Sequence, residues 1–148
     1  MSIHPAVNTV TFRRLSPEDL VALCREVGIE AVEWAGDVHV PTGDFDKARE
    51  ISLLCSEHGV TITSYGSYYQ GDDEGPGAGP FSSNLGPEKA LETARALQAP
   101  AIRVWAGRQA SGHASPGSRD AVASCLRAFC KEAEKSGIHV HLEYHRNT

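Results

Sequence analysis

Ionisable and apolar residues alternate near the end of the chain, in the run His139-Val140-His141-Leu142-Glu143-Tyr144-His145. Side chains of an extended strand alternate between its two faces, so the three histidines and the glutamate are expected to share one face. Imidazole nitrogen and carboxylate oxygen are ligands for Mn²⁺, Mg²⁺, Co²⁺ or Zn²⁺. The pattern therefore predicts either a divalent-metal site or a buried network of hydrogen-bonded side chains.

Further polar side chains come at or just after the ends of earlier segments that are expected to be strands. An inward arginine suits a carboxylate, a phosphate or a structural glutamate. Inward Trp and Tyr side chains can line a sugar site, because the faces of pyranose rings are apolar, and they can equally fill the interior of a barrel. The candidates for substrate contacts are Glu33, His39, Tyr65, Ser67, Arg103, Trp105 and His145.

A repeat of helix, glycine and strand organises the chain. Helical patterns stop at Gly28, Gly59 and Gly137, where a positive φ is often needed, and a β-rich run follows each of them. Pro100 takes the place of the glycine in a further unit. Ser118 is the expected N-cap of the last helix. The expected strands cover residues 9–13, 30–34, 60–65, 101–105 and 138–144, with four helices between them.

The faces of these strands favour a barrel over an open sheet. One expected face is apolar, whereas the other carries polar or ionisable side chains in nearly every strand, such as Glu33, Tyr65, Arg103 and Glu143. Helices cover both faces of a doubly wound sheet, but only the outer face of a (β/α)8 TIM barrel, whose reactive groups gather at the C-terminal strand ends. A closed barrel needs eight strands and about 250 residues. The sequence therefore predicts an incomplete α/β TIM barrel of about five parallel strands and four helices.

Composition and charge restrict the possible partners. The chain has 148 residues, 41% of them hydrophobic, which suits one domain with a real core. The formal net charge is −5, and the longest basic run is Arg13-Arg14, so a nucleic-acid partner is disfavoured. No apolar run approaches the roughly 18 residues of a membrane span, and the first residues do not resemble a secretory signal. Four cysteines without a CxxC pair indicate reduced thiols and a cytoplasmic protein.

Three stretches of the sequence resemble a known family. They are Leu142-Glu143-Tyr144-His145-Arg146-Asn147-Thr148, Val32-Glu33-Trp34 and Asp37-Val38-His39. Together they resemble the sugar phosphate isomerase/epimerase family of xylose-isomerase-like TIM barrels, and the resemblance makes residues 1–148 one partial TIM-barrel domain. It implies a divalent-metal enzyme that isomerises or epimerises a sugar or polyol through an enediolate. It also implies that Glu143 is a metal ligand and an acid/base group, and that His39 lies in the substrate site.

The family takes further metal ligands from strands six to eight, which this chain lacks, so little activity is expected of the chain alone. Two other functions remain open. The first is a non-catalytic half-barrel that works by self-association through its open sheet edges or by binding a partner. The second is a relative of the AP endonucleases, which would need several zinc-binding histidines and a basic groove. The expected ligands are a small sugar-like substrate and Mn²⁺, Mg²⁺, Co²⁺ or Zn²⁺.

Overall fold

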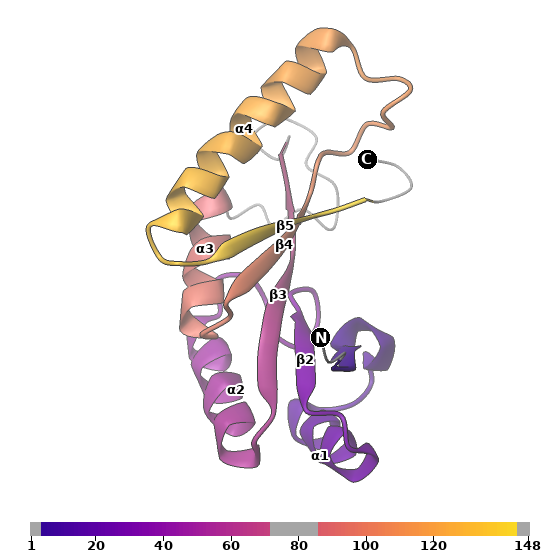
Figure 1. Ribbon diagram of the computed structural model, residues 1–148, viewed down its shortest axis with the longest axis vertical. Helices are drawn as coiled ribbons and strands as arrows, with labels where there is room; N and C mark the ends of the chain where they lie inside the picture. The colour runs from indigo at the N-terminus through magenta and orange to yellow at the C-terminus, as the bar shows by residue number, and fades with distance from the viewer. Residues whose placement is uncertain (1–3, 72–85, 145–148) are drawn as a thin grey trace.

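Five parallel strands form one sheet in the computed structural model, which describes residues 4–71 and 86–144 (Figure 1). The strands lie side by side in chain order, each pairing with the next one in sequence. Their bounds are β1 Ala6–Asn8, β2 Ala31–Ala35, β3 Thr61–Gln70, β4 Ala101–Trp105 and β5 His139–Glu143. This order, with a helix in each connection, confirms the predicted incomplete TIM barrel.

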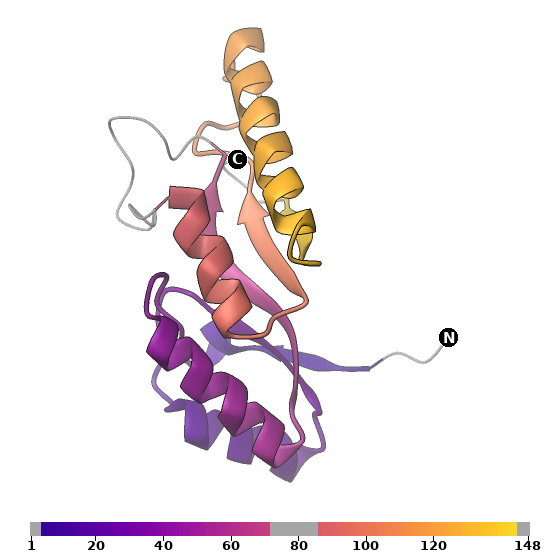
Figure 2. The ribbon, with the colours of Figure 1, turned by 90° about the vertical axis from the view of Figure 1, so that its left-hand side faces the viewer.

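The helices cover one face of this sheet. They are α1 Pro17–Val27, α2 Phe45–His58, α3 Gly86–Ala96 and α4 Pro116–Glu134. Figure 2 shows α2, α3 and α4 lying together in front of the strands. The core fills the space between these helices and the sheet, and its largest side chains are at most 1% exposed, among them Trp34, Ile51, Tyr65, Leu91 and Ile102. The opposite face of the sheet, here called the polar face, carries Glu33, Arg103 and Glu143.

Serine followed by proline starts two of the helices. The side chain of Ser16 caps α1, and Pro17 is its first residue. The last helix begins in the same way, with the Ser115 hydroxyl accepting from the Ser118 amide at 3.1 Å and Pro116 following the cap. The predicted N-cap Ser118 is therefore wrong by three residues. Proline is favoured at the first helical position because it has no amide hydrogen to leave unpaired, and this signal was present in the sequence.

The first strand comes earlier than predicted. The expected strand over residues 9–13 is wrong, since β1 covers Ala6–Asn8 and a 3-10 helix follows over Thr9–Phe12. The side chain of Asn8 accepts from the amide of Val10 at 3.1 Å. This local hydrogen bond competes with a strand ladder and turns the backbone out of the sheet.

A bulge in β3 changes which residues face which way. The register between β2 and β3 shifts after Ile62, so that Glu33 pairs with Ser64 and Trp34 with Tyr65. The extra residue is Thr63, and an extra residue reverses the alternation of every side chain that follows it. The prediction that Tyr65 lies on the polar face is therefore wrong, because this side chain is fully buried in the core under the helices.

All four cysteines lie in helices. Cys24, Cys55, Cys125 and Cys130 are free. Burial raises the pKa of the Cys24 thiol and is the main cause that raises the pKa of Cys55, so both stay protonated and unreactive at neutral pH. Among the helices of the described residues, none has the length and apolar composition to cross a membrane.

Candidate active site

A chain of polar contacts crosses the polar face near the C-terminal ends of the strands. Arg103 of β4 lies at its centre. Its Nε donates to Glu33 Oε1 of β2 at 3.0 Å, and its Nη1 donates to Glu143 Oε2 of β5. Asn8 of β1 donates to Glu33 Oε1 at 2.7 Å, and Trp105 Nε1 donates to Glu143 Oε2 at 2.6 Å. The contacts therefore join residues that lie far apart in the sequence and that only the sheet brings together.

The two carboxylates are held to different degrees. Both oxygens of Glu33 are engaged, since Oε2 also accepts from the Ser64 hydroxyl at 2.5 Å, and its side chain is 18% exposed. The Glu143 side chain is 38% exposed and, within the described residues, accepts hydrogen bonds through Oε2 alone. Glu33 therefore anchors the arginine, whereas one oxygen of Glu143 has no hydrogen-bond partner among the described residues.

Gly66 makes room for this arrangement. It pairs with Arg103 across β3 and β4. A methyl group at Gly66 would lie 2.8 Å from Arg103 Nη2 and 3.1 Å from Glu33 Oε1. Contacts this short are repulsive, so any side chain at this position would push the ion pair out of its present geometry.

Two aromatic side chains and a second ion pair extend the polar face toward the start of the chain. The ring of Tyr68 meets that of Trp105 edge-on, with centroids 5.1 Å apart. Arg13 donates to the Tyr68 hydroxyl at 3.2 Å and pairs with Asp37. Burial, and then the nearby Asp37, raise the pKa of Tyr68, so its hydroxyl stays neutral. Neither Arg13 nor Tyr68 was among the predicted site residues. Tyr68 comes to this face only through the bulge in β3.

His39 is buried and fully hydrogen-bonded. Its Nε2 lies 3.2 Å from the backbone oxygen of Leu15, which can only accept, so Nε2 carries the proton. Its Nδ1 then accepts from the Thr9 hydroxyl at 3.0 Å, and Thr9 in turn accepts from the Ala35 amide at 2.8 Å. Burial is the largest cause that lowers the pKa of His39, which favours the neutral ring. The structure thus places His39 as a brace between the turn after β2 and the segment before α1.

The remaining candidates do not join the contact chain. The Tyr65 hydroxyl donates to the Val40 backbone oxygen and lies 2.7 Å from the Thr42 hydroxyl, beneath the helices. Ser67 is also buried, and its hydroxyl donates to the backbone oxygen of Arg103 at 2.6 Å. His145 lies outside the described residues. Of the predicted candidates, Glu33, Arg103, Trp105 and Glu143 come together.

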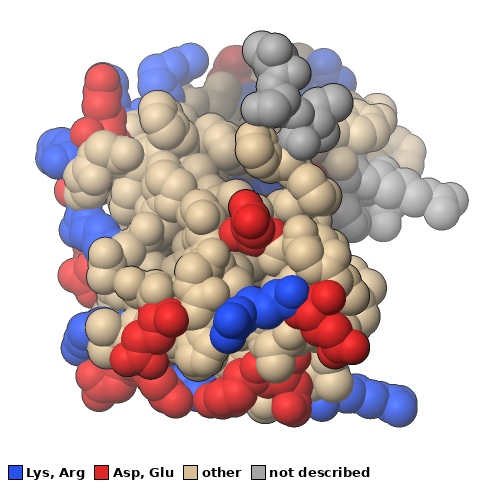
Figure 3. Space-filling model, turned by 60° about the horizontal axis from the view of Figure 1, so that its bottom comes forward, with Lys and Arg blue, Asp and Glu red and all other residues tan. Residues whose placement is uncertain are grey.

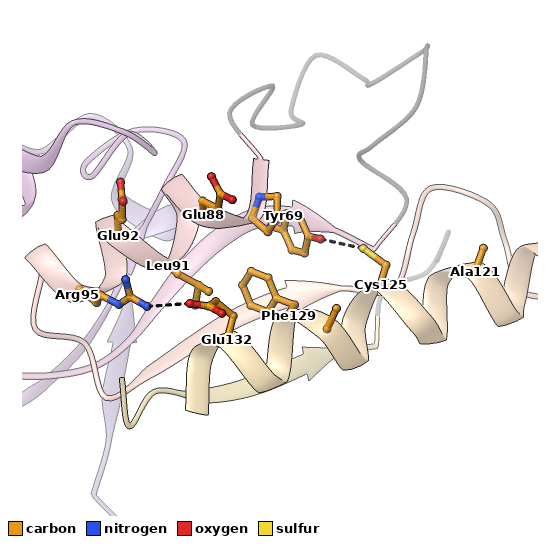
Figure 4. Close-up of a pocket in the computed structure, with 11 residues that line it drawn as sticks. Tyr69, Glu88, Leu91, Glu92, Arg95, Ala121, Cys125, Phe129 and Glu132 are labelled. Carbon is orange, nitrogen blue, oxygen red and sulfur yellow. Dashed lines mark hydrogen bonds and ion pairs between the residues drawn. The ribbon is translucent and has the colours of Figure 1, made fainter. Parts of the chain in front are cut away.

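One cavity of the described surface lies on the opposite side of the sheet from these residues. A cavity of about 640 Å³ opens between α3 and α4, on the helix side (Figure 4). There Tyr69 stacks on Phe129, its hydroxyl lies 3.0 Å from the Cys125 sulfur, and Arg95 approaches Glu132 to 3.9 Å. Glu33, Arg103 and Glu143 do not line this cavity.

The donor set can be tested against the metal that the sequence predicts. Within residues 4–71 and 86–144, no group of three or more His, Cys, Asp or Glu side chains lies close enough to share an ion. Glu143, the predicted ligand, already pairs with the guanidinium of Arg103, a cation that repels a second cation. The described residues therefore do not fit a metal ion by themselves.

Solved structures share this fold over about half of their own length. The probable 3-DHS dehydratase involved in petrobactin synthesis in Bacillus anthracis superposes with a TM-score of 0.76 and 21% identity, over 99% of this chain and 54% of that one. A xylose isomerase domain protein of Alicyclobacillus acidocaldarius gives 0.68 and 18%, over 97% and 50%. One from Salmonella typhimurium gives 0.64 and 17%, over 93% and 47%. Comparison with curated proteins finds no significant match.

The amino-acid sequence assigns the chain to a family more directly than these distant structural similarities do. The model of one protein family, described as xylose isomerase-like TIM barrel, matches residues 21–148. The match starts within α1 and includes every strand after β1, together with Glu33, Arg103 and Glu143. The chain belongs to the xylose isomerase-like TIM barrel family.

Proposed function

We propose that the polar face binds a sugar or polyol and forms part of a site for aldose-ketose isomerisation or ketose epimerisation. The observation that carries the proposal is Arg103 held between Glu33 and Glu143 at the C-terminal ends of the strands. A guanidinium beside a carboxylate offers both a donor for a substrate oxygen and an acceptor for a proton. The family of the chain supports an enzyme with this placement of reactive groups.

In the proposed reaction Glu143 moves the proton. Its carboxylate takes the proton from the carbon next to the substrate carbonyl, and the electrons of that C–H bond form the double bond of an enediolate. The Arg103 guanidinium stabilises the negative charge that develops on oxygen. The isomerisation is completed when the hydroxyl proton passes from one oxygen of the enediolate to the other and Glu143 returns its proton to the former carbonyl carbon. Epimerisation needs a second acid on the opposite side of the substrate.

Dehydration is a second candidate reaction. It is favoured by the likeness to the probable 3-DHS dehydratase, which extends over 99% of this chain. When the departing hydroxyl lies beta to a carbonyl, elimination begins with the same removal of a proton by a carboxylate. The two reactions differ in the next step, because elimination expels water instead of returning the proton.

Proton exchange tests the proposal without requiring full turnover. The chain is incubated in D₂O with a panel of ketoses, with and without Mn²⁺, and NMR follows deuterium entry at the carbon next to the carbonyl and any loss of water. Glu143→Gln keeps the shape of the side chain and should lower exchange by about 10²–10⁴-fold. Glu57→Gln, at an exposed site in α2, is the matched control and should leave it unchanged. Exchange that is equal in Glu143→Gln and the parent, or absent with every ketose, would overturn the proposal.

The surface charge supports a small ligand rather than a nucleic acid. On the face around α1, Lys and Arg side chains stand between Asp and Glu side chains instead of forming one basic patch (Figure 3). The formal net charge of −5 adds long-range repulsion of a polyanion. We also propose a cytoplasmic location, because four free thiols are typical of a reducing compartment.

A further inference from the structure

The two edges of the sheet differ in how open they are to another strand. Edge strand β1 is three residues long, follows Pro5 and runs directly into a 3-10 helix, features that protect an edge from pairing. Edge strand β5 covers five residues, contains neither proline nor lysine, and pairs with β4 alone among the described strands. Its residue Leu142 is 60% exposed although it is large and apolar. We propose that β5 pairs antiparallel with β5 of a second copy of this chain, about a two-fold axis at His141.

The backbone of β5 has the orientation that this pairing needs. The amide of His139 donates toward β4, to the Pro100 oxygen at 2.9 Å. The backbone amide and carbonyl groups of successive residues point to opposite sides of a strand. The backbone groups of His141 and Glu143 therefore also point to β4. The backbone groups of Val140 and Leu142 point to the open edge. In an antiparallel pair centred on His141, Val140 meets the partner's Leu142, and each donates to the other's carbonyl. The backbone amides and carbonyls that point to the open edge of one copy thus pair with those of the other copy.

The side chains match in the same register. On the helix side, Val140 lies opposite the partner's Leu142. Leu142 is exposed in the single chain and Val140 is partly exposed, so this pairing covers both apolar side chains. On the polar face, His139 lies opposite the partner's Glu143, a complementary pair, and the two His141 side chains lie opposite each other. Directly opposite residues bring their Cβ atoms to about 4.5–5.5 Å, and such pairs add to sheet stability. The sequence His-Val-His-Leu-Glu is therefore complementary to itself when reversed.

This pairing completes the candidate site from outside the chain. Glu143 takes its known partners, Arg103 and Trp105, from β4. The second copy brings the imidazole of the partner's His139 to the other flank of the same carboxylate, on the side of β5 that faces away from β4. The proposal stands apart from the proposed reaction, since it rests on the edge of β5 and not on turnover.

Disulfide trapping tests the register. In a Cys130→Ser background, which removes the exposed native thiol, His141→Cys places one cysteine directly across the axis from its own copy. The two copies of position 141 form a non-hydrogen-bonded pair, the closer of the two kinds of antiparallel pair, so mild oxidation should give a covalent dimer. His139→Cys, two residues away, faces the partner's Glu143 instead and should give no covalent dimer. Trapping through position 139 rather than 141, or through neither position, contradicts the proposed register.

Sedimentation tests the association itself. The parent chain should sediment as a dimer at tens of micromolar, and Leu142→Lys should weaken the association by at least about tenfold, because a lysine in the middle of an edge strand opposes pairing. Leu53→Lys is the matched control, since Leu53 is 61% exposed on α2, and should leave the association unchanged. A monomeric parent, or equal effects of the two lysines, would show that β5 is not the interface.

Discussion

Strands β2 and β5 have the same length and the same parallel pairing, and each carries one glutamate of the candidate site. Yet β2 is buried along nearly its whole length, with Trp34 fully inaccessible, whereas β5 leaves Leu142 60% exposed. The difference follows from the neighbours: β2 lies between β1 and β3, while β4 is the one neighbour of β5 among the described strands. Position in the sheet, more than the residues of the strand, decides how firmly each glutamate is held.

The candidate site therefore has a rigid side and a loose side. Glu33 receives hydrogen bonds from Asn8, Ser64 and Arg103. Glu143 sits on the edge strand and depends on two residues of β4. The role proposed for Glu143 as a base requires a firmly held carboxylate. The proposed second copy, or the sixth strand of a closed barrel, would give β5 a second neighbour at the same edge.

The largest expected effect contrasts the two strands directly. Trp34→Ala removes a fully buried side chain from β2 and should lower the free energy of unfolding by about 3–5 kcal/mol. Leu142→Ala in β5 should lower it by about 0.5 kcal/mol or less when the chain is dilute, because the side chain is mostly solvated already. Urea titrations at low micromolar concentration measure both values. Comparable losses would mean that β5 is packed as tightly as β2.

Removing the charge that joins the two sides should have the next largest effect. Arg103→Met leaves Glu33 and Glu143 without their common cation, in a place where the arginine is 14% exposed. The expected cost is about 2 kcal/mol of unfolding free energy, since an unpaired charge keeps its desolvation penalty. Arg103→Lys keeps the charge but not the forked donors, and should recover only part of the loss. Full stability of Arg103→Met would show that the two glutamates do not need the arginine.

A smaller effect is expected from crowding the ion pair rather than removing it. Gly66→Ala should cost about 1–2 kcal/mol, because its methyl group would meet both Arg103 and Glu33. Gly112→Ala is the matched control, since nothing lies within 4 Å of a methyl group there. Chemical denaturation compares the two. If they behave alike, Arg103 swings aside without penalty and the close approach is not required.

The smallest expected effect is the pH response of the buried brace. Burial lowers the pKa of His39 in the folded state, so the unfolded chain takes up the proton first as the pH falls below about 6.5. The stability that the neutral ring contributes is thus present above that pH and lost below it. His39→Gln should flatten the decline in unfolding free energy between pH 7 and pH 5, and His58→Gln controls for the loss of one imidazole. An unchanged slope in His39→Gln would contradict a titrating His39.

Regular patterns in the sequence predicted the architecture well. The helix-glycine-strand repeat gave the parallel sheet, and the alternation in β2, β4 and β5 placed Glu33, Arg103, Trp105 and Glu143 on one face. The alternation of side chains between the two faces gave a wrong prediction after Thr63, an extra residue in β3 that no sequence signal announces. This residue moves Tyr65 into the core and Tyr68 onto the polar face. The alternation also failed at Asn8, whose side chain bonds to the nearby backbone and ends the first strand.

Sequence alone determined the properties that depend on near neighbours: the periodicity of the strands, the glycines and prolines that end helices, and the family. Only the tertiary structure decided that His39 is a neutral brace, because its partners Thr9 and Leu15 lie in another segment. It also decided that Glu33 and Glu143 share one arginine, across a separation of 110 residues that the parallel sheet closes. Contacts of this kind depend on register and burial, which arise only when all the strands have packed together.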